Sequence, residues 1–127
     1  MSDAATPGAL ADAVADRDAT LVASLLQAGA NPNDRDERGV QALLVAAASD
    51  LFAIANLLLD HGANIWATEE LGFTAGRYAQ FGEGTLDEAE AQERHRFIAR
   101  LVESGFPWPP PSAAQVLAMR EAGQWPQ

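Results

Sequence analysis

Apolar residues recur along this chain at helical spacing, in short segments that polar turn residues separate. Leu10, Ala13 and Val14 lie three and four residues apart, which predicts the buried face of a helix. Asp12 and Asp16 fall on its opposite, solvated face. Repeated along the chain, this pattern predicts an all-α fold of short amphipathic helices.

Six further helices follow from the same spacing and from capping residues. Asp18, Asp50 and Ser112 are expected to begin three of them, because their side chains accept hydrogen bonds from the first helical N–H groups. The others are expected near residues 42–48, 74–81 and 86–103, and the Ser112 helix over 113–122. The positions expected to be buried are Leu21, Val22, Leu25, Leu26, Leu43, Ala46, Ala47, Ile54, Leu57, Leu58, Phe97, Ile98, Leu101, Val102, Val116 and Leu117.

Two pairs of glycines share one period. The interval from Gly29 to Gly62 equals the interval from Gly39 to Gly72. The segments 24–31 and 57–64 around the first pair also have the same layout. A fixed period of about 33 residues is typical of stacked supersecondary units.

The motifs at this period resemble the ankyrin repeat. Residues 58–64 read Leu-Leu-x-x-Gly-Ala-Asn, and residues 72–75 read Gly-x-Thr-Ala. The resemblance implies a helical repeat solenoid in which each unit is a hairpin-like connection followed by two short antiparallel helices. The chain departs from the family's Thr-Pro-Leu-His at residues 41–44, which read Gln-Ala-Leu-Leu, and at Gly76 and Arg77.

The repeat register predicts a single domain over residues 1–127. We expect a first, capping repeat at 7–35, a second at 36–68 and a third at 69–106, then a proline-rich arm and a C-terminal capping helix over 107–127. The interval from Gly62 to Gly105 exceeds the repeat period, which predicts an insertion of about ten residues near 82–92. Gly82–Gly84 is expected to be a flexible break, and Thr85 or Asp87 to cap the helix after it.

Charge narrows the classes of partner. The formal charge is −10, from 18 acidic and 8 basic residues. Such a surface repels phosphate backbones, so nucleic-acid binding is not expected, and it attracts basic proteins. The alternative is that the acidic excess only keeps the protein soluble. With no cysteine, no signal sequence and no long apolar run, we expect a cytoplasmic protein that does not bind a membrane.

No motif for catalysis is recognisable. His61 and His95 are the only histidines, and His61 suits the end of a helix, where its charge complements the dipole. Gly82–Gly84 lacks the lysine and hydroxyl of a phosphate loop. An enzyme would need acids such as Asp87, Glu90 and Glu93 to converge. We therefore expect no enzymatic activity, no cofactor and no metal ion.

The resemblance implies a binding surface instead, because the hairpin tips and first helices of ankyrin repeats line a concave face that contacts partner proteins. Aromatic and arginine side chains dominate interface energies, so Trp66, Leu71, Phe73 and Arg77 are expected to matter most. Alternatively, Trp66 and Phe73 pack under the insertion or the Trp108 segment. Carried over by position, the predicted site is Arg35, Glu37, Arg38, Val40, Ser49, Trp66, Thr68, Glu69, Glu70, Leu71, Phe73 and Arg77.

Two functions follow. The first is a monomeric protein–protein interaction module without activity of its own. Its partner is expected to be basic if the binding surface carries the net charge. In a narrower form, the module is an inhibitor or immunity-type protein. The second is a structural accessory or assembly factor for an enzyme, which binds through the long helix and the proline-rich arm.

Overall fold

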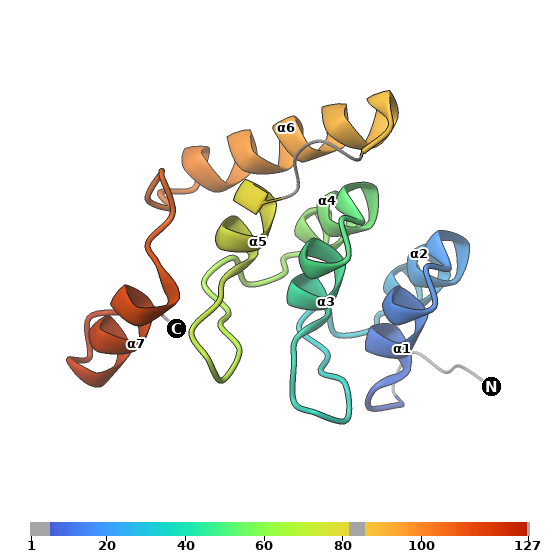
Figure 1. Cartoon of the computed structure of the whole chain (residues 1–127). Coiled ribbons are helices and arrows are strands. Elements are labelled where there is room, and N and C mark those ends of the chain that lie inside the picture. Colours follow the sequence, from blue (N-terminus) through green and yellow to red (C-terminus); the bar gives the residue numbers. More distant parts are fainter. Residues whose placement is uncertain (1–5, 82–85, 127) are drawn as a thin grey trace.

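In the computed structural model, three helix pairs stand side by side and a seventh helix follows them (Figure 1). The structure describes residues 6–81 and 86–126. Within these residues no strand is formed, and the all-α repeat fold expected from the sequence is confirmed. The helices are α1 (Ala9–Ala15), α2 (Ala19–Gln27), α3 (Ala42–Ala48), α4 (Phe52–Asp60), α5 (Ala75–Phe81), α6 (Glu88–Glu103) and α7 (Ala113–Glu121).

The helices form two rows. α1, α3 and α5 contact one another in order as an inner row, and α2, α4 and α6 form the outer row. Two hairpin-like loops project from one edge of the stack, closed by isolated bridges between Arg35 and Gln41 and between Thr68 and Thr74 (Figure 1). We call residues 35–41 the first hairpin and 68–74 the second. The inner row and the hairpins form the side of the stack that the resemblance implies is concave, which we call the concave face.

Small side chains let the rows approach closely. The buried core is rich in alanine, and larger residues such as Leu44 and Leu58 fill the space between the pairs. The helix Ala42–Ala48 has the predicted bounds, and Leu43, Ala46 and Ala47 are buried as expected. Close packing of small and branched residues therefore holds the repeats together.

An acidic residue stabilises the first hairpin. The Asp36 carboxylate accepts hydrogen bonds from the backbone N–H groups of Arg38 (2.9 Å) and Val40 (3.0 Å) and from the Arg38 guanidinium (2.8 Å). Burial alone would raise the pKa of Asp36, but these hydrogen bonds and the Arg38 charge outweigh it and lower the pKa below 3.8. Glu69, at the equivalent position of the second hairpin, accepts the corresponding bond from the Phe73 N–H (2.9 Å).

The turns between paired helices correct one expectation. The sequence predicts that Asp50 begins the fourth helix, but α4 begins at Phe52 after the N-cap Leu51. Asp50 instead has a left-handed backbone, with φ of 60°, and so does Arg17 at the equivalent position of the first repeat. Both residues reverse the chain between two helices, and this conformation is incompatible with the start of a helix.

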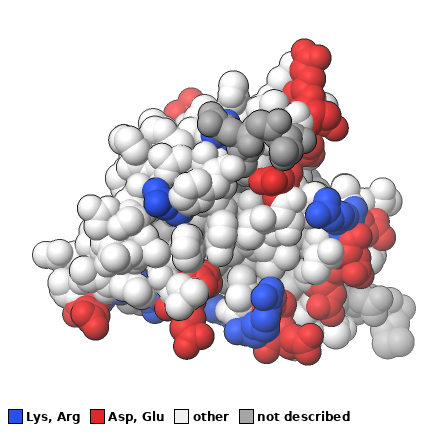
Figure 2. All heavy atoms as spheres, viewed as in Figure 1, with Lys and Arg blue, Asp and Glu red and all other residues white. Residues whose placement is uncertain are grey.

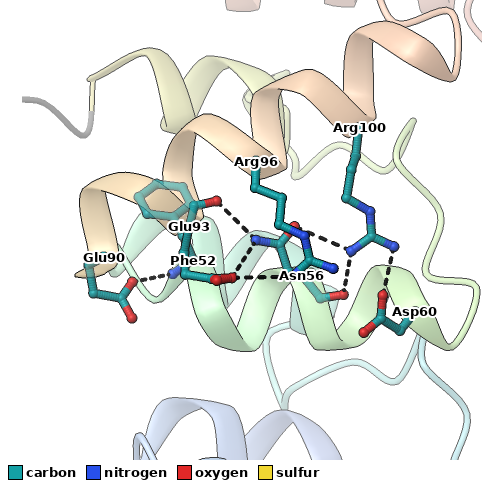
Figure 3. Close-up of polar contacts among 7 residues, drawn as sticks. All are labelled: Phe52, Asn56, Asp60, Glu90, Glu93, Arg96 and Arg100. Atoms are coloured by element: carbon teal, nitrogen blue, oxygen red, sulfur yellow. Dashed lines mark hydrogen bonds and ion pairs between the residues drawn. The ribbon is translucent and has the colours of Figure 1, made fainter. Parts of the chain in front are cut away.

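Helix α6 docks on α4 through polar groups as well as apolar ones (Figure 3). The rings of Phe52 and Phe97 lie 5.9 Å apart, and beside them the Asn56 amide donates to the Glu93 carbonyl (2.9 Å). Arg100 donates to the Asn56 carbonyl (3.0 Å) and forms an ion pair with Asp60 (2.8 Å). These contacts fix the register of the long helix along its neighbour.

The start of α6 confirms the predicted cap Asp87 but lies two residues later than the sequence predicts. Asp87 caps the helix by accepting from the Glu90 N–H (2.8 Å), so the helix begins at Glu88 and not at residue 86. The expected break at Gly82–Gly84 and the alternative cap Thr85 lie outside the described residues. Ser112 and Asp18 also cap helices as predicted, while α7 ends at Glu121, one residue early.

Three residues expected in the core are exposed instead. Leu21, Val102 and Leu117 have 44%, 46% and 37% of their surface exposed. Each stands next to a residue that is buried, namely Val22, Leu101 and Val116. Adjacent helical positions point about 100° apart, so a narrow contact stripe buries only one of each pair.

The C-terminal segment packs against the third helix pair and the second hairpin. Phe106 and Trp125 enclose the Trp66 ring at centroid distances of 5.2 and 5.4 Å, and the Trp125 indole N–H donates to the Trp66 carbonyl (2.8 Å). A Cβ at Gly76 would stand 2.6 Å from the Phe106 ring. The ring thus takes the space of a side chain at position 76, which explains this departure from the repeat pattern.

Candidate functional site

Aromatic side chains and an arginine lie along the second hairpin and α5, from Leu71 near the hairpin tip to Phe81 at the far end of the helix. Phe73 and Tyr78 are stacked, with centroids 5.4 Å apart and an interplanar angle of 24°. The Arg77 guanidinium lies over the Phe81 ring, 4.5 Å from its centroid. Phe81 and Leu71 are 61% and 63% exposed. We call Leu71, Phe73, Arg77, Tyr78 and Phe81 the concave patch.

Charged residues border this patch. Burial raises the pKa of the Tyr78 phenol, and the Glu69 carboxylate raises it further, while Arg38 opposes them. Both charges are therefore close enough to act on the phenol, which stays neutral up to a higher pH than usual. Arg77 also donates to the Gln80 side chain (2.9 Å), so its guanidinium is held in place over Phe81.

The structure divides the predicted site residues into groups. Arg38, Glu69, Leu71, Phe73 and Arg77 belong to or border the concave patch. A second group lines a separate pocket beside α7: Arg35, Trp66, Thr68 and Glu70.

The remaining three residues join neither group. Glu37 is exposed at the tip of the first hairpin, and Val40 is half-buried against the core. Ser49 is the C-cap of α3, at the end of that helix away from its hairpin. Trp66 is half-buried against the C-terminal segment, which is the alternative that the sequence left open for it.

Sequence reasoning misses Tyr78 and Phe81 as surface residues. Both continue the helical spacing of the third repeat, so the pattern places them in its helix without a surface role. The signal that points to Phe81 is its spacing from Arg77. Residues four apart share one helix face, and an arginine beside an aromatic ring is typical of an exposed cation–π pair.

The acids at the start of α6 do not converge on a pocket. Asp87 caps the helix, Glu90 accepts from the Phe52 N–H (2.9 Å), and the Glu93 carboxylate accepts from the Asn56 amide (3.2 Å) (Figure 3). Over residues 6–81 and 86–126, no three His, Asp or Glu side chains are grouped so as to hold a metal ion. None of the helices that the structure describes is long and apolar enough to cross a bilayer.

Comparison with known proteins identifies the repeat. No family model matches the chain. A protein of Treponema pallidum (strain Nichols) that carries the name "ankyrin repeat-containing protein" is 38% identical over 87 residues, which are 68% of this chain and 29% of that protein. This chain is an ankyrin repeat protein. Potassium channel KOR1 of Oryza sativa subsp. japonica is 42% identical over 65 residues, which are 51% of the ankyrin repeat chain and 8% of the channel.

The ankyrin repeat chain thus spans less than a third of the first relative and less than a tenth of the second. In its ankyrin stack, the threonine position of the family motif is occupied by Gln41 in the second repeat and by Thr74 in the third. The Thr74 hydroxyl accepts from the Arg77 N–H (3.1 Å) and caps α5. Gln41 makes no capping hydrogen bond with its side chain to any described residue.

The arrangement around Tyr78 predicts a pH titration. Tyr78 is the single tyrosine in the sequence, so the ultraviolet absorbance of tyrosinate reports it alone. We expect its pKa to lie above 10.0, because burial and Glu69 favour the neutral phenol. The resulting stabilisation is present below the pKa of the unfolded chain and is lost as the pH rises through the raised pKa.

Two matched variants test the cause of that shift. Glu69→Gln removes the charge but keeps an oxygen that accepts from Phe73, so we expect the pKa of Tyr78 to fall. Glu70→Gln should leave it unchanged, since Glu70 does not act on the phenol. An equal effect of the two variants, or a midpoint at 10.0 in the folded wild type, would contradict the geometry.

Proposed function

We propose that the chain is a non-enzymatic interaction module that binds a partner protein through the concave patch. The observation that carries the proposal is the exposed Phe81 ring under the ordered Arg77, on a surface where Leu71 of the second hairpin is exposed as well. Large apolar groups that face water together favour a covered state, and aromatic and arginine residues are enriched at interface hot spots. Membership of the ankyrin repeat family supports the same function.

The charge of this face favours a partner with a mixed rather than a strongly basic surface. The charged residues in or beside the patch are Arg38, Arg77 and Glu69, so the acidic excess of the chain is not concentrated there. Figure 2 shows uncharged atoms over much of the side in view, with many acidic groups on the half where Figure 1 places α1, α2 and the start of α6. The acidic excess therefore acts on a basic partner by long-range steering.

The test removes the exposed apolar groups and keeps the fold. We expect the wild type to capture a partner from a lysate of its source cell, and a Leu71→Ser/Phe81→Ser variant to bind that partner at least about tenfold more weakly. The matched control is Leu21→Ser/Val102→Ser, which removes comparably exposed apolar side chains from α2 and α6. Equal capture by the Leu71/Phe81 variant, or loss only in the control, would exclude the concave patch.

In the narrower form of the proposal, the captured partner is an enzyme or toxin that the chain inhibits. Purified partner would then lose activity on addition of the wild type and not on addition of the Leu71→Ser/Phe81→Ser variant.

The alternative, an accessory factor that binds through the C-terminal arm, is favoured by Trp108, which is 37% exposed among prolines. Deletion of residues 106–127 would not test it cleanly, because Phe106 and Trp125 pack on Trp66. Trp108→Ala is the better variant. Loss of the partner with Trp108→Ala, and not with the concave-patch variant, would support the alternative.

A further inference from the structure

A second surface lies beside the concave patch, between the two hairpins and α7. It is a pocket of about 740 Å³. Gln41 and Arg35 line it from the first hairpin, and Glu70 from the second. Trp66, Glu121 and Trp125 line its other walls. Its residues come from three separate parts of the chain, which only the fold brings together.

Gln41 leaves a buried side-chain acceptor without a hydrogen bond to any described residue. Its side chain is 8% exposed, and its Oε1 has no hydrogen-bond donor among the described residues. As the N-cap of α3 it also fails to satisfy a helix N–H, whereas Thr74 does so at the equivalent position of the next repeat. The Leu44 N–H donates to the Gln41 backbone carbonyl instead (2.9 Å), so the buried Oε1 is the one group left unsatisfied here. A buried acceptor without a donor lowers stability, and a residue kept at such a cost in the lining of a pocket points to a binding role.

Some charged side chains of the pocket have hydrogen-bond partners within the protein and others have none in the part of the chain that the structure describes. Arg35 donates to the Gly39 carbonyl (2.8 Å), and Arg120 donates to the Glu69 carbonyl (3.4 Å). Across the described residues, the Glu70 and Glu121 carboxylates have no hydrogen-bond or ion-pair partner. The pocket therefore has two exposed carboxylates without a partner in the described protein and, beside them, the buried Gln41 amide oxygen, which lacks a donor there.

We propose that this pocket binds a cationic nitrogen group, a guanidinium or an ammonium. The Gln41 amide would accept from it once the end of the side chain turns about its broad last torsion. Glu70 and Glu121 would balance its charge, and the packed Trp66 and Trp125 side chains would form an apolar wall beside it. The overall charge of −10 attracts such a group from a distance. The site does not depend on the concave patch.

The binding test uses a defined probe on the full chain. ¹⁵N NMR follows the indole N–H signals of Trp66 and Trp125 while acetyl-Gly-Arg-Gly-amide is added. We expect saturable shifts that a citrulline peptide, uncharged but of the same shape, does not produce. Spermidine in a parallel titration shows whether a free amine serves as well as a protein side chain. Equal shifts with citrulline, or none with the arginine peptide and spermidine, would overturn the proposal.

A variant separates binding from folding. Gln41→Thr restores the residue that the third repeat carries, so we expect a higher midpoint of thermal unfolding together with affinity for the arginine peptide that is weaker by about tenfold. Glu121→Gln, on the surface of α7, should also weaken binding, and Glu37→Gln, which does not line the pocket, should not. Wild-type affinity in both Gln41→Thr and Glu121→Gln would refute the site.

Discussion

Replacement of Phe97 by alanine is expected to lower the free energy of unfolding by about 3–5 kcal/mol. Phe97 is fully buried and its ring lies 5.9 Å from that of Phe52, between α6 and α4. Beside the Phe97–Leu101 stripe, α6 is held mainly by polar contacts such as those of Asn56. Loss of the ring therefore removes much of the apolar surface that docks the long helix, and it leaves a cavity that the polar neighbours cannot fill.

Chemical denaturation followed by circular dichroism measures this loss. The matched control is Val102→Ala on the same helix, where 46% of the side chain is exposed and we expect a change of at most about 0.5 kcal/mol. If Phe97→Ala were as mild as Val102→Ala, α6 would be held by its polar contacts alone. The role assigned to the Phe52–Phe97 pair would then be wrong.

Gly72→Ala is expected to destabilise the protein by about 2–5 kcal/mol, from two causes that add. Gly72 has φ of +93°, and a left-handed backbone costs a residue with a Cβ about 1–2 kcal/mol. A Cβ there would also stand 2.5 Å from the Ala113 carbonyl oxygen and 2.9 Å from the Leu117 side chain, and such overpacking costs about 1–3 kcal/mol. Helix α7 would have to move away from the second hairpin.

The first hairpin supplies the matched control. Gly39 stands at the equivalent position with φ of +83°, but no described atom lies within 4 Å of the point where its Cβ would stand. Gly39→Ala should therefore cost only the backbone part, about 1–2 kcal/mol. The difference between the two variants, measured by the same denaturation, reports the packing of α7. Equal losses would mean that α7 does not rest on Gly72.

The concave patch and the pocket beside α7 both include residues of the second hairpin, but they offer a partner different chemical groups. The concave patch offers apolar and aromatic groups beside charges of both signs, whereas the pocket beside α7 has carboxylates without a partner, and a buried amide oxygen without a donor, among the described residues. A single partner chain that crosses the hairpin could contact both. Leu71→Ser/Phe81→Ser and Gln41→Thr affect them separately, so a double-mutant cycle with an identified partner would show whether the two surfaces are coupled.

Local patterns in the amino-acid order were enough to predict the repeat and its helices. The recurrence of the glycines, the spacing of apolar residues around Leu43 and the capping side chains of Asp18, Asp87 and Ser112 can each be recognised in short segments of chain. Because helix caps and amphipathic spacing are short-range effects, they can be read without knowledge of what packs against them.

Contacts between distant residues decided the rest. Phe106 lies over Gly76, Trp125 encloses Trp66, and the predicted site divides between the concave patch and the pocket of Gln41. Residues 59 apart meet in the Trp66–Trp125 hydrogen bond. Which side chain such a contact buries depends on how whole helices approach one another, and this approach is set by the summed packing of the stack, which no local pattern contains.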